Sequence, residues 1–392
     1  MSSDAQMDDL LDRHADGPAM VWHEPAKTFV LSRYAEGRQF LADNSLLRDA
    51  DRAEPGAMVH AFKTDDPRRP GDRNRAMGWL DGPDHARVRG PIAQAFYRRV
   101  AAARPAVRHI VEERLDGLAG GPRFDLVADF AVTVPIEVIA HLFGVEPGAL
   151  PRFRTWSESV MKVFNPWRTE AETAAIGEAW EGFNVYMEAA IVERRHAPRD
   201  DLISDLAAPG ALGGALSDAE IRVNCLNLLV GGAMTSADLI SSATWLLLKN
   251  PGPLAALRTD PARIGAVVEE ALRLEPPVDG AQRILAQDRV VAGCPVRATQ
   301  VVAVSIPAAN RDHRAFDDPD RFDVDRPRTP HLSFGGGAHM CIGAPLARLQ
   351  AQVAILAMIN RFPGLGLTEP ESAPKWRATP SFHGLESLLV ET

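Results

Sequence analysis

The residue with the most suggestive surroundings is Cys341, which follows a glycine-rich run and precedes a predicted helix. Glycines at 335, 337 and 343 let backbone amides approach the sulfur, and a helix N-terminus favours negative charge there. Both effects stabilise a thiolate, which acts as a nucleophile or as a metal ligand. Because no second cysteine lies nearby, iron in a haem fits this thiolate better than zinc does.

A second candidate for chemistry is a threonine inside a long predicted helix. The helix begins at the capping box of Ser217 and Glu220 and ends near Asn250, before a proline. Within it, the Thr235 hydroxyl can bond the carbonyl of Gly231 and open a local groove. At 1.5 Å per residue the helix is about 50 Å long, enough to cross a whole domain. We therefore expect one domain over residues 1–392, with 1–17 as a poorly ordered tail.

Composition excludes several classes of protein. The chain has 392 residues and a formal charge of −9, so the excess positive charge that nucleic-acid binding needs is missing. Three widely spaced cysteines are too few for a disulfide scaffold. The acidic N-terminus lacks the features of a signal peptide, and no apolar run reaches the length of a membrane span. The sequence predicts a cytoplasmic protein without a membrane or nucleic-acid partner.

The remaining pattern is mainly helical, with a small β part. Short β-prone runs around Trp22 and over 27–31 predict a hairpin, and 34–41 predicts a helix. Helical periodicity dominates from 85 to 274, strands are expected over 287–304, and a helix returns over 342–362. The stretch 51–82 is rich in Pro, Gly, Arg and Asp, which predicts a long loop.

The loop before the cysteine carries a family resemblance. Each place of the motif FGxGxHxCxG is filled, by Phe334, Gly335, Gly337, His339, Cys341 and Gly343. The chain therefore resembles the cytochrome P-450 family of haem-thiolate monooxygenases. That resemblance implies a helical triangular prism around a buried haem b, with Cys341 as the iron ligand. Glu270 and Arg273 resemble the family's ExxR pair, and Arg321 is expected to be the third member of that structural cluster.

The resemblance also implies which residues hold the cofactor. A haem carries two propionates, and cationic or neutral donors should meet them. The residues expected at this position are His85, Arg89, Arg283 and His339. Phe334, Gly335 and Gly343 should contact the cofactor beside the thiolate.

The oxygen-activating segment departs from the family pattern. Gly231, Gly232 and Thr235 fit the family's AGxET or AGxDT motif, but Met234 replaces the acid, and its thioether carries no proton. Protons could then arrive through water, Thr235 and Ser236, or through Asp238 one turn later. Alternatively Met234 merely packs, or the enzyme does not activate dioxygen in the usual way.

Substrate contacts can be proposed only by position. They comprise the loop 73–79, Asn227, Val230, Val278 to Ala281 with Asp279 among them, and Phe382. Asn227 and Asp279 could fix a polar group of the substrate, since a buried polar group without a partner costs about 1 to 3 kcal/mol. Equally, Asn227 could bind a water and Asp279 could face solvent.

The expected function is monooxygenation, most simply hydroxylation, of a small to medium organic molecule by a monomer using O2. The chain carries no flavin or ferredoxin domain, so electrons should come from a separate ferredoxin and its reductase. Arg98, Arg99, Arg108 and Arg348 could form a basic docking face, or could be ordinary solvated residues. Two other classes stay open: a haem-thiolate enzyme that uses peroxide or performs coupling or rearrangement, and a non-catalytic haem sensor.

Overall fold

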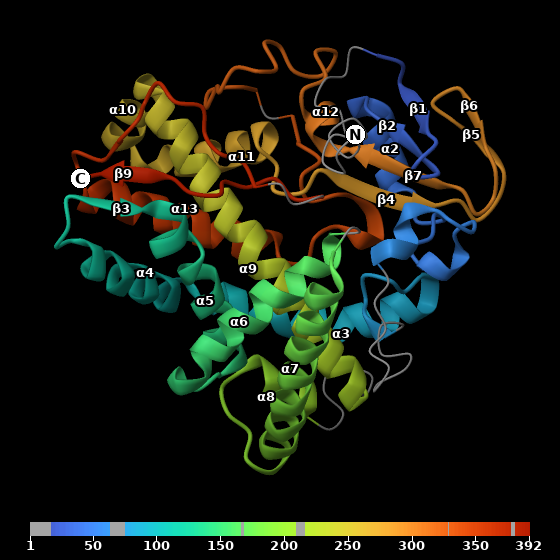
Figure 1. The fold of residues 1–392 in the computed structure, drawn as a ribbon, viewed down its shortest axis with the longest axis horizontal. Helices are drawn as coiled ribbons and strands as arrows, with labels where there is room; N and C mark the ends of the chain where they lie inside the picture. The colour runs from blue at the N-terminus through green and yellow to red at the C-terminus, as the bar shows by residue number, and fades with distance from the viewer. Residues whose placement is uncertain (1–16, 63–74, 166–167, 209–215, 328, 378–380) are drawn as a thin grey trace.

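A helical mass and a small β region together give the molecule a roughly triangular outline (Figure 1). The computed structural model describes residues 17–62, 75–165, 168–208, 216–327, 329–377 and 381–392. The expected tail, residues 1–17, lies outside this part of the chain except for Gly17. The outline is broad across the sheet and helix α10 and narrows toward α7 and α8, as the prism expectation requires.

The β region is built mainly on one four-stranded sheet, in the order β1-β2-β7-β4. The predicted hairpin is present, because β1 (Met20–His23) pairs antiparallel with β2 (Thr28–Leu31). Strand β7 (Val301–Ser305) lies parallel to β2 and antiparallel to β4 (Gly280–Ile284). The other strands are β5 (Arg289–Val291) with β6 (Cys294–Val296), and β3 (Arg123–Asp125) with β9 (Leu389–Glu391) and β8 (Gly366–Leu367).

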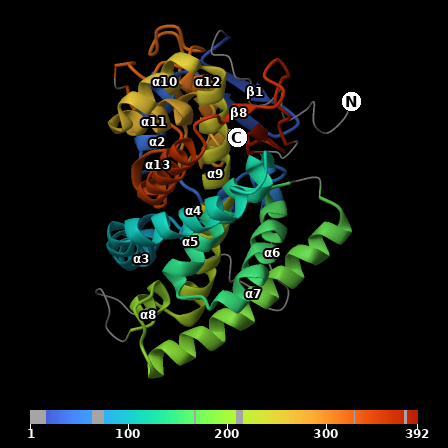
Figure 2. The same ribbon diagram turned by 90° about the vertical axis from the view of Figure 1, so that its left-hand side faces the viewer.

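Helix α9 (Asp218–Lys249) is the axis of the helical part, as its length predicts. Both halves of its capping box are formed, since the Ser217 hydroxyl accepts from the Glu220 amide and the Glu220 carboxylate accepts from the Ser217 amide. It packs against α5, α6, α7, α8, α10, α11 and α13, and Figure 2 shows it running behind α4 and α5. A helix so surrounded can present a site to several elements at once.

The other helices form layers around α9 (Figures 1 and 2). They are α2 (Tyr34–Ala42), α3 (Gly82–Ala102), α4 (Arg104–Leu118), α5 (Thr133–Phe143), α6 (Leu150–Met161), α7 (Glu170–His196), α8 (Leu202–Ala207), α10 (Pro251–Thr259), α11 (Ile264–Leu274), α12 (Ile306–Asn310) and α13 (Ala344–Arg361). A π-helical segment, η4 (Leu126–Ala131), leads into α5. Short 3-10 turns are η1 (Ala50–Arg52), η2 (Met58–Phe62), η5 (Pro147–Ala149), η6 (Lys162–Phe164), η8 (Pro261–Arg263) and η9 (Gly337–His339).

Two hydrophobic cores hold these elements together. The larger surrounds α9, and the smaller lies between the four-stranded sheet, α2 and α12. Leu126–Phe143 and α9 are long and apolar enough to span a membrane, but each is 67% buried inside the fold. Their apolar composition is explained by burial in a protein core.

The stretch 51–82 is less irregular than the sequence predicts. Within its described part, η1 and η2 form two short turns that pack against Ile284 and Val301. Residues 63–74 lie outside the described chain. The turns escaped prediction because a single turn leaves no periodic pattern in a proline- and glycine-rich sequence.

Candidate functional site

The cysteine loop is held in place by contacts with helix α2. The Ala338 amide donates to the side-chain oxygen of Asn44 at 2.8 Å, and the Cys341 amide donates to the Phe334 carbonyl at 2.9 Å. Gly337 has a φ of +66°, and a Cβ there would lie 2.6 Å from the carbonyl oxygen of Leu41. Both the left-handed backbone and the close approach require glycine at this position. The motif glycine therefore fixes the loop against α2.

Cys341 stands just before α13 and lines a large cavity. Burial raises the pKa of its thiol, while backbone hydrogen bonds involving Gly343 and Ala344 and the charges of Arg89 and Arg348 act in the opposite direction. The thiolate-stabilising amides that the sequence predicts are present, but they do not outweigh burial. A bound metal ion supplies what is missing, because it deprotonates a coordinating thiol outright.

One wall of the cavity carries a cluster of cations that we call the cation cluster: Arg48, Arg89 and Arg283. Arg48 donates to the carbonyls of Gly78 at 3.2 Å and Gln282 at 2.9 Å. Burial lowers the pKa of Arg48, and burial together with the charge of Arg48 lowers the pKa of Arg283 to about 9. Asp81 is the carboxylate that opposes both shifts.

The sequence does not predict a role for Arg48, because this residue lies in no recognised motif and isolated arginines usually face solvent. Its backbone amide donates to one oxygen of Asp81 at 2.8 Å, and the Asp49 amide donates to the other at 3.0 Å. Its guanidinium lies 5.5 Å from the ring centroid of Trp79. Three guanidiniums and one carboxylate leave this wall with excess positive charge, which is costly unless an anion binds.

His339 completes the lining of this wall, and His85 packs against it without lining the cavity itself. His85 on α3 is buried, and its ring lies 4.2 Å from that of His339, measured between centroids. The Nε2 atom of His85 is buried with no hydrogen-bond partner among the described residues. Burial and the neighbouring cations lower the pKa of His339 to about 2, so this ring is neutral. An orphaned buried nitrogen beside a cavity indicates a polar ligand.

The ExxR pair forms as predicted, but its third member is different. Arg273 donates to both carboxylate oxygens of Glu270, at 2.9 and 2.8 Å, and both side chains are buried. The second cation on Glu270 is Arg326, whose Nε lies 3.1 Å from Oε1. The expected Arg321 contributes only its carbonyl oxygen, and its guanidinium is 67% exposed.

This correction has a simple geometric cause. The chain turns after Arg321, and the Asp323 amide also donates to Glu270, at 3.0 Å. The turn brings Arg326 back over Glu270, where its Nη2 bonds the carbonyls of Asp318 and Arg321. The order of residues along a turn does not reveal which side chain points inward.

On the opposite side of the cavity, α9 forms the predicted threonine contact. The Thr235 hydroxyl donates to the Gly231 carbonyl at 2.5 Å, and both residues line the cavity. Gly232 serves a different purpose, because a Cβ there would lie 3.0 Å from the Ile139 side chain on α5. Met234 is half-buried, packs against the larger core and is not among the residues that line the cavity.

Ser236 and Asp238 are buried and turned away from the cavity lining. The Asp238 carboxylate accepts two hydrogen bonds from Arg377 Nη2, both 2.7 Å long. Burial raises the pKa of Asp238 to about 7, against the opposing effect of Arg377. Gly384 leaves room for this pair, since a Cβ there would lie 2.0 Å from the Asp238 oxygen.

Four of the five predicted substrate contacts line the cavity: Asn227, Val230, Val278 and Phe382. Asp279 does not, although both of its neighbours do. Its backbone amide donates to Ser381 and its carbonyl accepts from Ile306, in extended chain just before β4. Successive residues of an extended chain face opposite sides. Because Val278 and Gly280 face the cavity, the Asp279 side chain between them points away from it. Of the predicted loop 73–79, residues 73 and 74 lie outside the described chain.

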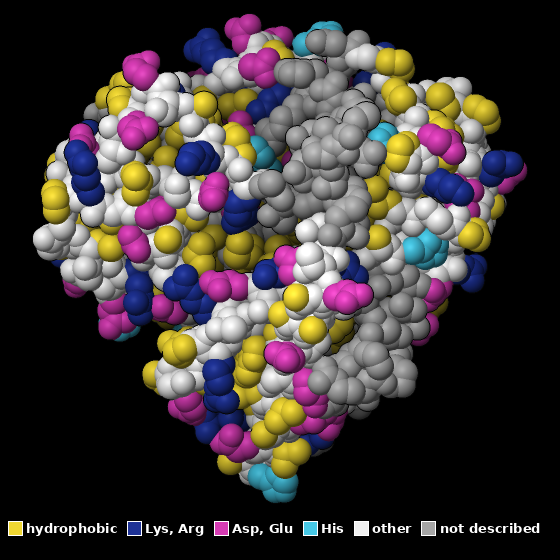
Figure 3. Space-filling model, viewed as in Figure 1, with side chains coloured by type: hydrophobic (Ala, Val, Ile, Leu, Met, Phe, Trp, Pro, Cys, Tyr) yellow, Lys and Arg dark blue, Asp and Glu magenta, His cyan; other side chains and the backbone are white. Residues whose placement is uncertain are grey.

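The basic residues expected at a docking face are largely paired with acids. Arg98 and Arg99 both bond Asp205, and Arg348 bonds Glu269 at 2.6 and 2.7 Å. Arg108 is exposed. On the face of the molecule in Figure 3, acidic and basic side chains are interspersed among the described residues. Local neutralisation weakens the steering that unpaired arginines would give.

These features define a class of protein: a mainly helical fold in which a cysteine just before a helix and a threonine in a long central helix line one large cavity. The Cytochrome P450 family model matches residues 159–376. The chain is 37% identical over 369 residues to 6-deoxyerythronolide B hydroxylase of Saccharopolyspora erythraea, covering 92% of this chain and 89% of that protein. It is 34% identical to mycinamicin IV hydroxylase/epoxidase of Micromonospora griseorubida, covering 89% and 86%.

Solved structures agree with this assignment. The crystal structure of myxobacterial cytochrome P450 CYP267B1 in complex with myristic acid has a TM-score of 0.84 and 32% identity, covering 99% of this chain and 96% of that one. The chain belongs to the cytochrome P450 family and is a bacterial-type monooxygenase. The family's cofactor is a haem iron.

The residues present fit such a group. The cavity has a volume of about 430 Å³, within the roughly 300 to 1,000 Å³ of ordinary ligand pockets. It offers the Cys341 thiol and, on its wall, the cation cluster and His339. The unpaired His85 nitrogen is buried beside the ring of His339. A large, partly apolar dianion with a metal at its centre satisfies all of these groups.

Proposed function

We propose that this protein binds haem b through Cys341 and hydroxylates a small to medium organic substrate held on the α9 side. The observation that carries this proposal is that Cys341 and Thr235 line one and the same cavity. His85, Arg89, Arg283 and His339 would meet the propionates, and Arg48 would join them. Phe334 and Gly335 line the same cavity beside Cys341, while Gly343 lies behind the sulfur as the residue before α13.

When bound, the haem supplies dioxygen binding and O–O cleavage, which thiolate ligation favours. The protein's own part is to position and to exclude water. Phe164, Val230, Val278 and Phe382 present apolar surface to a substrate. The Thr235 hydroxyl, anchored on the Gly231 carbonyl, holds a hydrogen-bonding group at the cavity wall formed by α9.

For proton supply we propose Asp238 in place of the acid that Met234 replaces. A pKa of about 7 allows this carboxyl to bind and release a proton near neutrality. Its partner Arg377 is 19% exposed and extends from the buried carboxylate toward the surface. Asp238 lies three residues, or nearly one turn, beyond Thr235 on the same helix.

The test of this route is coupling, the fraction of reducing equivalents that ends in hydroxylated product instead of peroxide. Met234→Glu should raise coupling because it restores an acid beside Thr235. Asp238→Asn should lower coupling and slow decay of the oxygenated complex, with a solvent isotope effect larger than that of the parent. If Asp238→Asn leaves coupling and decay unchanged, Met234 only packs and protons arrive by another path.

We further propose that electrons come from a separate ferredoxin and reductase, in the cytoplasm, with the whole chain acting as one domain and as a monomer. Extensive pairing of Arg98, Arg99 and Arg348 favours docking by shape and short-range contacts over long-range steering. The rate of reduction should then fall only weakly with rising ionic strength.

Turnover experiments decide between this function and its main alternative. The proposal expects product with a ferredoxin, its reductase and NADPH, and little with hydrogen peroxide alone. The reverse pattern would identify a peroxide-using haem-thiolate enzyme, which the absence of an acid at position 234 favours. Ligand-induced spectral shifts without either turnover would indicate a haem sensor.

A further inference from the structure

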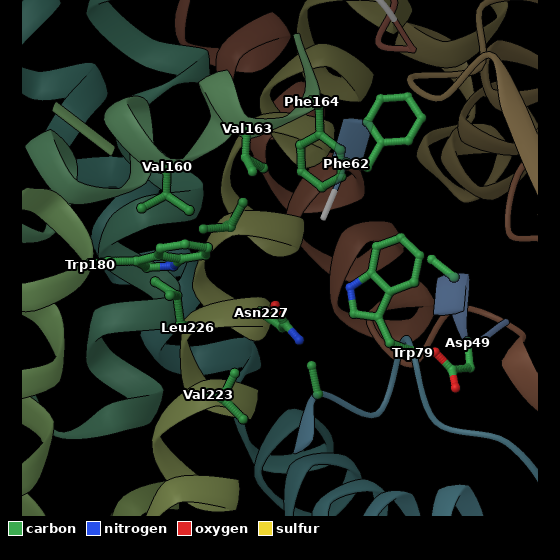
Figure 4. Close-up of a pocket in the computed structure, with 13 residues that line it drawn as sticks. Asp49, Phe62, Trp79, Val160, Val163, Phe164, Trp180, Val223, Leu226 and Asn227 are labelled. Atoms are coloured by element: carbon green, nitrogen blue, oxygen red, sulfur yellow. The ribbon is translucent and has the colours of Figure 1, made fainter. Parts of the chain in front are cut away.

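An outer compartment adjoins the haem cavity, and its lining points to a class of substrate. It lies between α6, α7, α9 and the segment around Trp79, and Figure 4 shows its walls. Its described lining comprises Asp49, Ala50, Phe62, Ala76, Trp79, Val160, Val163, Phe164, Trp180, Val223, Leu226, Asn227 and Val230. Trp79, Phe164, Asn227 and Val230 also line the haem cavity, so the two spaces are continuous.

Aromatic rings stand on several walls of the compartment, among aliphatic side chains. Trp180 stands on one side of the compartment and Trp79 on the other (Figure 4). Phe62 lies 6.4 Å from Phe164 and Phe164 lies 4.9 Å from Phe382, centroid to centroid. This row of phenylalanines runs from the outer compartment into the haem cavity. Ring faces and edges on several sides suit a ring-bearing ligand, because aromatic pairs gain energy beyond area burial.

Asn227 is the uncommitted polar group in this apolar lining. It lies in the middle of α9, yet it is exposed, and its amide is directed into the space between Trp180 and Trp79. No described residue hydrogen-bonds this amide. Asn224, one turn earlier, differs completely: it accepts from the Met77 amide at 2.9 Å and donates to the carbonyls of Arg75 and Glu220. Asn224 is structural, whereas Asn227 is free for a ligand.

The charge of the compartment selects against anions. Asp49 is the single charged residue in the described lining of the outer compartment, which therefore offers an anionic ligand no cation. One oxygen of the Asp49 carboxylate accepts from the Asp51 amide at 3.0 Å as the cap of η1. The rest of this lining is neutral and mostly apolar, which suits a neutral ligand.

The position of Asn227 on α9 sets the distance between the two ends of the substrate. It precedes Thr235 by eight residues, which is about 12 Å along a helix axis. A substrate group bonded to Asn227 therefore lies well away from the carbon that faces Thr235. In Figure 4 the nitrogen of the Asn227 amide points toward Trp79, which suits a carbonyl oxygen as its acceptor.

We propose that the substrate is an elongated, uncharged, ring-bearing ketone or amide whose carbonyl accepts a hydrogen bond from Asn227, and which is hydroxylated at its opposite end. This inference rests on the proposed function. The reaction replaces C–H by C–OH with one oxygen atom of O2, while the other oxygen leaves as water with two electrons and two protons from the donor system.

The test uses the haem-loaded full chain and a matched pair of probes, 4-acetylbiphenyl and 4-ethylbiphenyl. They differ by one carbonyl oxygen, and the span from the carbonyl to the far ring carbon is comparable with the distance set by Asn227. Affinity is read from the ferric low-spin to high-spin shift, which needs no turnover. We expect the ketone to bind about tenfold tighter, as one hydrogen bond to an amide that is otherwise left unpaired under the bound ligand allows.

Two variants assign the effect to Asn227. Asn227→Leu keeps the side-chain volume and should reduce the preference for the ketone to within about twofold. Val223→Leu changes the same wall without a polar group and should retain the preference. An intact carbon monoxide difference band in both variants shows that the haem site has folded.

Several outcomes would overturn the proposal. These are equal affinity for the two probes, no binding of either, a preference that survives Asn227→Leu, or tighter binding of 4-(aminomethyl)biphenyl, which would assign the site to Asp49 and an amine. Hydroxylation beside the carbonyl would refute the orientation. Ketone binding as expected without oxidation by any electron donor would refute the proposed monooxygenation and leave the substrate class standing.

Discussion

The two sides of the haem cavity are built in different ways. On the thiolate side, one short segment supplies the Phe334 carbonyl, the positive-φ Gly337 and Cys341. On the α9 side, the lining comes from η1, η2, α6, α7, α9, β4 and the segment that contains Phe382. The residues of the thiolate side follow one another in the sequence, although Leu41 and Asn44 hold that segment in place, whereas a side assembled from many segments can vary one residue at a time.

The largest expected effect belongs to the thiolate side. Cys341→Ser should abolish the carbon monoxide difference band at about 450 nm that thiolate ligation gives to a haem protein. Cys294→Ser, at a half-buried position on β6, is the control and should keep the band. A band that persists in Cys341→Ser would place the iron ligand elsewhere and remove the basis of the comparison.

The next effect tests the cluster behind the thiolate side. Arg326→Gln should lower the free energy of unfolding by about 3 kcal/mol or more, because it leaves the buried Glu270 short of a partner. Arg321→Gln removes an exposed guanidinium and should change it by less than about 0.5 kcal/mol. Urea unfolding of both variants, read by loss of the Soret band, measures the difference. Equal effects would contradict the assignment of Arg326.

A smaller effect is expected at the cation cluster, which joins the two sides. Arg48→Gln should speed the transfer of haem to an acceptor apoprotein about tenfold, the equivalent of one charge-assisted hydrogen bond. Haem dimethyl ester lacks the propionate charges. When both proteins are loaded with this ester, Arg48→Gln and the parent should therefore lose the cofactor at the same rate. Arg52→Gln, on the exposed part of η1, is the control. If Arg48→Gln also lost the ester about ten times faster than the parent does, Arg48 would act only through its hydrogen bonds to the Gly78 and Gln282 carbonyls and not through the propionates.

The last prediction concerns Asp238 on the α9 side. Its pKa is raised to about 7 in the fold, against about 4 in an unfolded chain, so the folded state binds a proton that the unfolded state releases between these values. Its stabilising contribution is therefore complete below about pH 4 and declines by at most about 1.4 kcal/mol per pH unit until pH 7.

The measurement for Asp238 is infrared. A protonated carboxyl band should disappear between pH 6 and pH 8 in the parent and be absent from Asp238→Asn. Glu172, whose pKa is lowered by the Thr169 amide, should show no such change in this range. If the protonated-carboxyl band were absent at both pH 6 and pH 8, Arg377 would be keeping Asp238 ionised over this whole range.

The same difference explains what the sequence could predict. The cysteine loop, the capping box of α9 and the hairpin are local, so residue types at fixed spacing were enough. The direction of the other side chains has different causes. A turn brings Arg326 inward, the alternation of an extended chain points Asp279 away from the cavity, and the wall that contains Arg48 is contributed by distant segments. None of these leaves a periodic signal, and the family motif pointed to Arg321 because it could not give the direction of a side chain.

The contact of the cysteine loop with α2 has a consequence for how the protein is made. Ala338 bonds Asn44 across 294 residues, and Gly337 rests on the Leu41 carbonyl. A chain synthesised from its N-terminus at about 5 to 20 residues per second holds α2 ready many seconds before the cysteine loop leaves the ribosome. Haem capture is thus a late event, and until then the apolar walls of the cavity are exposed to chaperones and proteases.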